Sequence, residues 1–248
     1  MIDRLVSMLR DTSIRVSDLM IGTFHSVCLR ILSRYGHRIG LMKDWRIIDE
    51  KEIEVIVHNM VEKMPDQIRD YSLSLRRKVN LCLPKNGSDE WTVSPKLVKK
   101  QIERIKSYAL LPEEYKGDNN HDSALAYFFE NYQNELNRLN ALDFDDLLMY
   151  TFRLLTREKC LPRIRHVLVD EFQDISPQRA RLLAALREQN SYTSLFAVGD
   201  DWQAIYRFSG AELSLTTAFE GHFGEGAQCA LDTTYRFNDR IGEIANKF

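Results

Sequence analysis

The sequence predicts an α/β protein whose parallel sheet is interrupted by a helical insertion. Short apolar runs, each stopped by polar or glycine residues, alternate with helix-periodic segments. This alternation is typical of strands buried on both faces of a parallel sheet. One long stretch, residues 51–142, is helix-periodic instead. With 248 residues, of which 44% are hydrophobic and 28% charged, the chain can bury a substantial core.

Four apolar runs are the expected strands of one sheet: residues 20–24 (MIGTF), 166–169 (HVLV), 194–198 (SLFAV) and 229–231 (CAL). A helix is expected after the first run because Cys28, Leu32 and Tyr35 share one helical face. Another is expected after the second run, where Ser176 and Pro177 supply an N-cap and a first-turn proline.

The predicted insertion, residues 51–142, contains three helix-periodic segments with no convincing strand between them. These are KEIEVIVHNMVEKM, SPKLVKKQIERIKSYALL and DSALAYFFENYQNELNRL. Turn-rich joints separate them at residues 84–95 and 116–122. The α/β domain is therefore expected to comprise residues 1–50 and 143–248.

Charge and cysteine usage exclude several classes of protein. Thirty-four basic and 36 acidic residues leave a net charge of −2, so any site for a polyanion must be local. The four cysteines lie far apart without zinc-binding or disulfide spacing, which favours reduced thiols and a cytoplasmic location. No stretch approaches the ~20 apolar residues that span a bilayer, so neither secretion nor membrane insertion is expected.

Asp170 and Glu171 directly follow the 166–169 run. Ligands of open α/β sheets bind beyond the carboxyl ends of the strands. There an aspartate can hold Mg²⁺ while the neighbouring glutamate activates a water for attack on a phosphoryl group. The same pair also suits a simple helix cap, and the residues alone leave both interpretations open.

Two further segments point to the same sheet edge. After the 194–198 run, Gln203 is placed to sense a terminal phosphate or its attacking water, and Tyr206 and Phe208 offer aromatic faces to bases. After the last run, Tyr235 and Arg236 suit a stacked nucleobase and a phosphate. The alternatives are core packing for the first aromatic pair and an ordinary surface position for Tyr235 and Arg236.

Together these segments resemble the ordered motifs of the UvrD/Rep/PcrA-like superfamily 1 DNA helicases. The motifs are IGTFHSVCLRIL, LDFDDLL, VLVDEFQD, VGDDWQAIYRFSGA and LDTTYRFNDRIGEIAN. From about residue 166 onward, the sequence most closely resembles the helicase IV branch. The resemblance implies a RecA-like sheet of the P-loop NTPase type with a helical subdomain. It also implies ATP and Mg²⁺ as cofactors, and 3′ to 5′ movement on single-stranded DNA with unwinding at single-strand/duplex junctions.

The resemblance assigns roles on the ATP side of the protein. Asp170 would coordinate Mg²⁺, Glu171 would activate water, and Gln203 would couple the γ-phosphate to DNA contacts. Tyr235 would stack on adenine, and Arg236 would reach the γ-phosphate.

On the DNA side, the resemblance implies that Thr23 and His25 touch the DNA backbone. Phe208 would stack on a base, and Tyr206 belongs to the same expected DNA-binding group.

The family's phosphate loop, GxxxxGK[ST], is absent from this sequence, because none of the 11 glycines is followed by lysine. The resemblance implies that the phosphate loop and a second RecA-like domain are missing helicase parts. We therefore expect the isolated chain to have little or no ATPase activity, since the phosphate cradle carries much of the catalysis.

Two alternatives from other functional classes remain open. One is a non-catalytic DNA- or protein-binding module that uses the basic stretches at residues 74–80 and 96–106, although a solvated helix face explains the second stretch as well. The other is a metal-dependent nuclease, whose two-metal site would be built from five acids: Asp170, Glu171, Asp174, Asp200 and Asp201.

Overall fold

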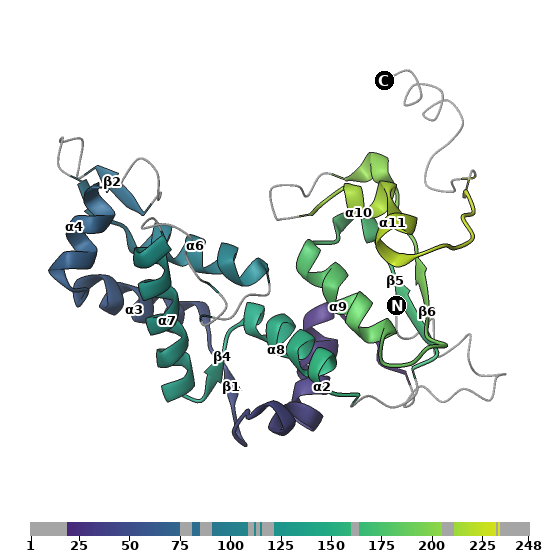
Figure 1. The fold of residues 1–248 in the computed structure, drawn as a ribbon, viewed down its shortest axis with the longest axis horizontal. Coiled ribbons are helices and arrows are strands. Elements are labelled where there is room, and N and C mark those ends of the chain that lie inside the picture. Colours follow the sequence, from purple (N-terminus) through teal and green to yellow (C-terminus); the bar gives the residue numbers. More distant parts are fainter. Residues whose placement is uncertain are drawn as a thin grey trace.

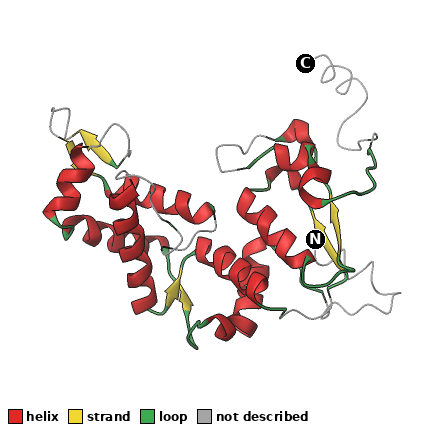
Figure 2. Cartoon of the chain, viewed as in Figure 1, coloured by secondary structure: helices red, strands yellow, loops and turns green. Residues whose placement is uncertain are grey.

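The structure is a computed structural model that describes residues 19–74, 81–84, 91–108, 112, 115, 122–159, 164–204, 211–231 and 233. The described residues form two lobes, each with its own apolar core (Figure 1). We call them the α/β lobe and the insertion lobe. Helices dominate both lobes (Figure 2). Within the described ranges, no helix is long and apolar enough to cross a membrane.

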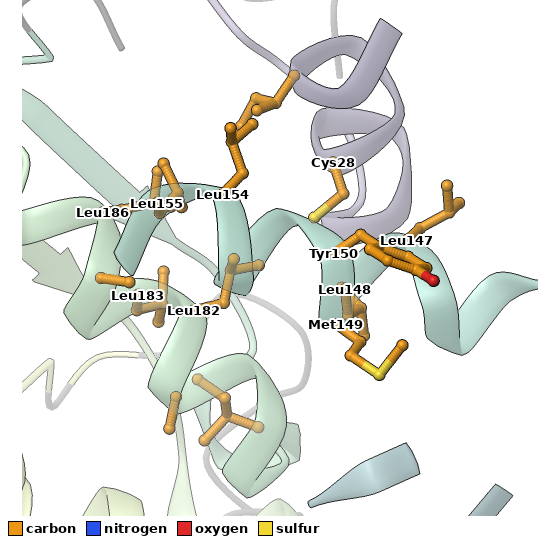
Figure 3. Packing of buried hydrophobic residues seen from close by; sticks show 14 of the residues in the cluster. Cys28, Leu147, Leu148, Met149, Tyr150, Leu154, Leu155, Leu182, Leu183 and Leu186 are labelled. Atoms are coloured by element: carbon orange, nitrogen blue, oxygen red, sulfur yellow. The ribbon is translucent and has the colours of Figure 1, made fainter. Parts of the chain in front are cut away.

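The α/β lobe is built around a helix that is packed between two others. Its elements are α2 (Phe24–Tyr35), η2 (Gly36–Ile39), α8 (Phe144–Arg157), β5 (His166–Val169), η3 (Phe172–Asp174), α9 (Pro177–Arg187), β6 (Ser194–Ala197), η4 (Asp201–Gln203), α10 (Ser214–Thr217) and α11 (Phe219–Phe223). Figure 3 shows α8 between Cys28 of α2 and Leu182 of α9, with Leu148 and Leu154 among its buried residues. The position of α2 and α9 therefore depends on α8.

The insertion lobe contains α3 (Glu50–Glu62), α4 (Asp66–Ser74), β2 (Cys82–Pro84), β3 (Trp91–Val93), α6 (Pro95–Ser107) and α7 (Asp122–Arg138). Helix α3 begins where the sequence provides a capping box, in which Asp49 and Glu52 each accept a hydrogen bond from the other's backbone N–H. The core of this lobe includes Val57, Ile102 and Phe128.

The chain passes between the lobes on two short parallel strands, β1 (Arg46–Ile47) and β4 (Ala141–Leu142). Ile47 packs against the α/β core and Ile48 belongs to the insertion core. On the return, Ala141 belongs to the insertion core and Leu142 to the α/β core. We propose that residues 51–142 are an insertion, because the chain passes from one core to the other at Ile47–Ile48 and returns at Ala141–Leu142.

A mixed α/β chain with a parallel strand pair is confirmed, but two of the four predicted strands are wrong. β5 and β6 pair in parallel, from His166 opposite Ser194 to Val169 opposite Ala197. Residues 20–23 are irregular, and Phe24 already begins α2. Residues 229–231 are also irregular and exposed. An apolar run forms a strand only beside a partner backbone, and the described residues provide none for these two runs.

Two further strand predictions need correction. The expected burial of both sheet faces is wrong for β5 and β6, where Leu168 is 72% and Phe196 61% exposed. In the insertion, the antiparallel pair β2–β3 occurs where no strand was predicted, with Cys82 opposite Val93. Trp, Thr and Val favour strand geometry, but the turn-forming residues around β3 hide this preference in the sequence.

A buried ion cluster joins the two lobes. Lys106 of α6 is fully buried, and its Nζ lies 2.7 Å from Oδ2 of Asp143 and 2.8 Å from Oδ1 of Asp146. Tyr132 of α7 donates a hydrogen bond of 2.9 Å to Asp143. Asp143 is also the N-cap of α8, in a capping box with Asp146. The cluster therefore fixes α6 and α7 of the insertion lobe against the first turn of α8.

Burial and the charges of the cluster shift the pKa values of two neighbouring carboxyl groups, Asp143 and Asp145, in opposite directions. Burial opposes ionisation of Asp143, but the Lys106 ammonium outweighs it and holds the pKa of Asp143 below its usual value. Burial and then the charge of Asp143 raise the pKa of the neighbouring Asp145 to about 7. An acid with a raised folded-state pKa binds its proton more tightly when folded, so its contribution makes stability fall as pH rises from about 4 to about 7.

We predict that Asp145→Asn flattens this pH dependence, because an amide does not titrate. Relative to the variant, the wild-type chain should lose on the order of 1–2 kcal/mol in its free energy of unfolding between pH 5 and pH 8, after allowance for partial solvent screening. Urea unfolding at several pH values measures this. The exposed Asp70→Asn is the control and should retain the wild-type slope. Equal slopes for Asp145→Asn and wild type would contradict the assignment.

Candidate functional site

The parallel pairing of β5 and β6 brings two polar loops to one edge of the sheet. Val169 lies opposite Ala197, so the residues after each strand leave the sheet side by side. The pairing continues beyond the strands, where the Val198 N–H donates to Val169 and the Phe172 N–H donates to Val198, each over 2.9 Å. These backbone hydrogen bonds therefore bring Asp170 and Glu171 close to the loop after β6, as predicted.

The loop after β5, residues 170–174, is called the acid loop below. Glu171 has φ 51° and ψ 47°, the left-handed conformation that a residue with a side chain rarely adopts. The carboxylate of Asp170 accepts a hydrogen bond of 3.0 Å from the Glu171 N–H, which helps to hold this turn. Asp170 and Glu171 are both exposed, so their carboxylates can reach a ligand beyond the sheet edge.

Gln173, which sequence reasoning missed, joins the two loops. Its side chain is buried, and its Nε2 donates to the Glu171 carboxylate over 2.7 Å. Its Oε1 accepts a hydrogen bond of 3.0 Å from the Asp200 N–H in the loop after β6. A Cβ on Gly199 would lie 2.8 Å from this Oε1, so the close approach requires glycine there. The sequence feature that could have indicated this role of Gln173 is its amide, which stands among acidic residues at the end of a predicted strand.

Gln203 lies in the loop after β6, as predicted, but its hydrogen bond stays within that loop. It ends η4, and its Nε2 donates to the carboxylate of Asp200. Asp200 also caps η4 by accepting from the Trp202 N–H. In this arrangement Gln203 is exposed at the sheet edge, while Gln173 supplies the side-chain link to Glu171.

The remaining predicted residues of this site lie outside the described residues: Tyr206, Phe208, Tyr235 and Arg236. Their roles stay predictions. The five acids proposed for a nuclease are all described, yet within the described part of the chain no three histidine, cysteine, aspartate or glutamate side chains gather closely enough to hold a metal ion.

Thr23 and His25, the predicted DNA contacts, lie at the N-terminal end of α2. The Thr23 hydroxyl caps the helix by accepting from the Ser26 N–H. The His25 ring packs edge-on against the ring of Phe144, with 5.5 Å between centroids. Burial, and then the positive charge of Arg179, lower the pKa of His25, so the ring is neutral at pH 7 and offers hydrogen bonds rather than charge.

Two further residues beside this helix end were missed by sequence reasoning. Phe144 is 57% exposed in the first turn of α8, where the other apolar residues of its motif point into the core. The sequence feature that could have indicated this position of Phe144 is an aromatic residue among the acidic residues at the start of a helix. Arg30 folds back along α2 and donates to the Ile21 carbonyl, next to Gly22. The Thr23 hydroxyl, the Arg30 guanidinium and the exposed Phe144 ring thus each lie near the N-terminal end of α2.

Comparison with known proteins identifies the relatives of this chain. The family description "UvrD/REP helicase N-terminal domain" matches residues 1–224. The ATP-dependent DNA helicase SRS2 of Saccharomyces cerevisiae is 58% identical over 211 residues, 84% of this chain and 18% of that protein. DNA helicase IV of Escherichia coli is 60% identical over 124 residues, 50% of this chain and 18% of the relative. The ATP-dependent DNA helicase PcrA of Bacillus subtilis is 29% identical over 237 residues, 93% of this chain and 29% of the relative. The chain therefore spans less than a third of the length of these relatives.

We predict that Gln173→Leu destabilises the chain by about 1–3 kcal/mol, because it leaves the Asp200 N–H and the Glu171 carboxylate without their partner. Urea unfolding measures the loss. Gln203→Leu is the matched control, since that side chain is exposed and its replacement should cost less than about 0.5 kcal/mol. Equal stability of the two variants would show that Gln173 does not hold the loops together.

Proposed function

Because this chain belongs to the UvrD/REP helicase N-terminal domain family, we propose that it is part of an ATP-dependent DNA helicase. In this proposal it carries the water-activating carboxylate and one section of the single-strand path. The observation that carries the proposal is the pair of strand ends joined by Gln173, with Glu171 and Gln203 exposed at the same edge. The parallel pair β5–β6 is then part of a RecA-like sheet.

The donor set at the sheet edge fits Mg²⁺ and a nucleotide. Mg²⁺ is usually held by one or two carboxylates together with substrate phosphates, and Asp170 offers one exposed carboxylate. When bound, the ion would neutralise charge on the phosphates. Glu171, whose carboxylate Gln173 holds by a hydrogen bond, would orient the attacking water.

The other predicted ATP-side residues complete the proposal. Gln203 would couple the γ-phosphate to DNA contacts, Tyr235 would stack on adenine, and Arg236 would reach the γ-phosphate. Because this sequence has no GxxxxGK[ST], we expect low ATP turnover by the chain as given. DNA binding is the better readout for it.

Single-stranded DNA would lie across the N-terminal end of α2. Thr23 and His25 offer hydrogen-bonding groups to the backbone, Arg30 offers positive charge, and the exposed Phe144 ring offers a stacking face for a base. Tyr206 and Phe208 would add further aromatic faces. Translocation 3′ to 5′, unwinding at a single-strand/duplex junction and a cytoplasmic location are retained as parts of this proposal.

Of the two basic stretches in the alternative interpretation, residues 75–80 lie outside the described residues, and 96–106 has two of its five basic side chains paired within the protein. Lys106 is buried in the ion cluster, and Lys99 pairs with Glu50 and Glu103. These charges are already neutralised within the protein, so they are poorly placed to release counterions from DNA. Among the described residues, the acids of the two loops do not gather in a group of three that could hold a metal ion, so a two-metal nuclease gains no support.

We predict that the chain binds a fluorescent oligo(dT) and that Phe144→Ala weakens this binding by about tenfold, because base stacking contributes about 1–3 kcal/mol per base. Fluorescence anisotropy at fixed salt measures the affinity. Tyr192→Ala, which removes an exposed aromatic ring from the loop before β6, is the control and should bind as the wild type does. Absence of binding by the wild type, or equal affinity of the two variants, would refute the proposed DNA surface.

A further inference from the structure

The first turn of α9 connects the acid loop to the DNA-side end of α2. The helix begins at Pro177 with Ser176 as its N-cap, and only Ile175 separates this cap from the acid loop. Arg179, which is partly buried, donates from Nη1 to the carbonyl of Asp174 over 3.5 Å. Its guanidinium also lies over the ring of Phe24, the first residue of α2, at 5.6 Å from the centroid. One side chain therefore contacts both proposed functional segments.

Helix α9 is itself held against the insertion lobe. Gln178 donates to the carbonyl of Lys106 over 3.1 Å, and Arg181 donates to the carbonyl of Tyr108 over 2.6 Å. These carbonyls lie at the C-terminal end of α6, where helix carbonyls have no partner within their own helix. The backbone from which Arg179 extends is thus fixed by its neighbours, and its contacts with Asp174 and Phe24 are the adaptable part.

The guanidinium also acts at the predicted DNA contact itself. The charge of Arg179 is the second cause, after burial, of the lowered pKa of His25. Arg179 is thus close enough to influence His25, which lies two residues after Thr23. A phosphate arriving there would be attracted to the same guanidinium.

We propose that Arg179 is a positioning residue that couples the acid loop to the DNA-contacting end of α2. DNA bound at Thr23 and His25 draws the guanidinium toward its phosphate, and the weak contact with the Asp174 carbonyl changes with it. The inference rests on the proposed function, because it requires single-stranded DNA at α2. Arg179 is then the side chain through which bound DNA would influence the acid loop and Glu171.

Hydrogen exchange in the 248-residue chain, with and without oligo(dT), tests this coupling. In the wild type, DNA should change the exchange rate of the Asp174 and Ile175 amides, which close the turn of the acid loop, by at least about twofold. Measured at an oligo(dT) concentration that saturates each variant, Arg179→Gln should lose this response, and Arg179→Lys should restore part of it. Arg187→Gln, at the far end of α9, is the matched control and should respond as the wild type does.

A second readout on the same variants does not require DNA. An NMR titration should find that Arg179→Gln raises the pKa of His25, whereas Arg187→Gln leaves it unchanged. Absence of DNA binding by the wild type would overturn the proposed function. Binding without an acid-loop response in the wild type, a full response in Arg179→Gln, or an unchanged His25 titration in Arg179→Gln would overturn the coupling role alone.

Discussion

The register of β5 against β6 is the constraint on which the candidate site depends. With Val169 opposite Ala197, the acid loop and the loop after β6 leave the sheet at the same level. A slip by one residue would turn every side chain of one strand to the other face. It would also separate the Phe172 N–H from its acceptor, Val198. Gln173 reinforces the register from the side, since its amide reaches both loops and the absence of a side chain at Gly199 gives it room.

The second structural requirement is the junction between the two cores. Removing one partner of a buried ion pair costs roughly 3–5 kcal/mol, because it leaves a buried charge without compensation. Here the pairing of Lys106 with Asp143 and Asp146 also sets the first turn of α8. That turn presents Phe144 to His25. The ion cluster therefore positions a residue of the proposed DNA surface without touching DNA.

The sequence predicts correctly those elements that depend on short-range patterns. The strands at 166–169 and 194–197, and the Ser176 cap of α9, follow from short-range patterns that the structure confirms. The runs at 20–24 and 229–231 failed because a strand needs a partner backbone, which composition does not reveal. In the first case the Thr23 cap begins a helix instead.

The residues that were missed depend on long-range contacts. Gln173 bonds to a residue 27 positions away, and the partners of Lys106 lie 37 and 40 positions away. Arg179 reaches Phe24 across the lobe from another helix. No periodicity or capping rule places such pairs together, so the link between the two loops, and between the acid loop and α2, emerged only from the three-dimensional arrangement.

We propose that the two loops form one site for a phosphate-bound divalent ion, and the position of the bound ion tests this proposal most directly. Mn²⁺ with ATP, titrated into the isotopically labelled chain, reports its position by paramagnetic broadening of amide NMR signals. We expect the earliest broadening in both loops, at residues 170–173 and 199–203, and we expect Asp170→Asn to weaken it. Broadening confined to one loop, or centred on another surface, would contradict a shared ion site.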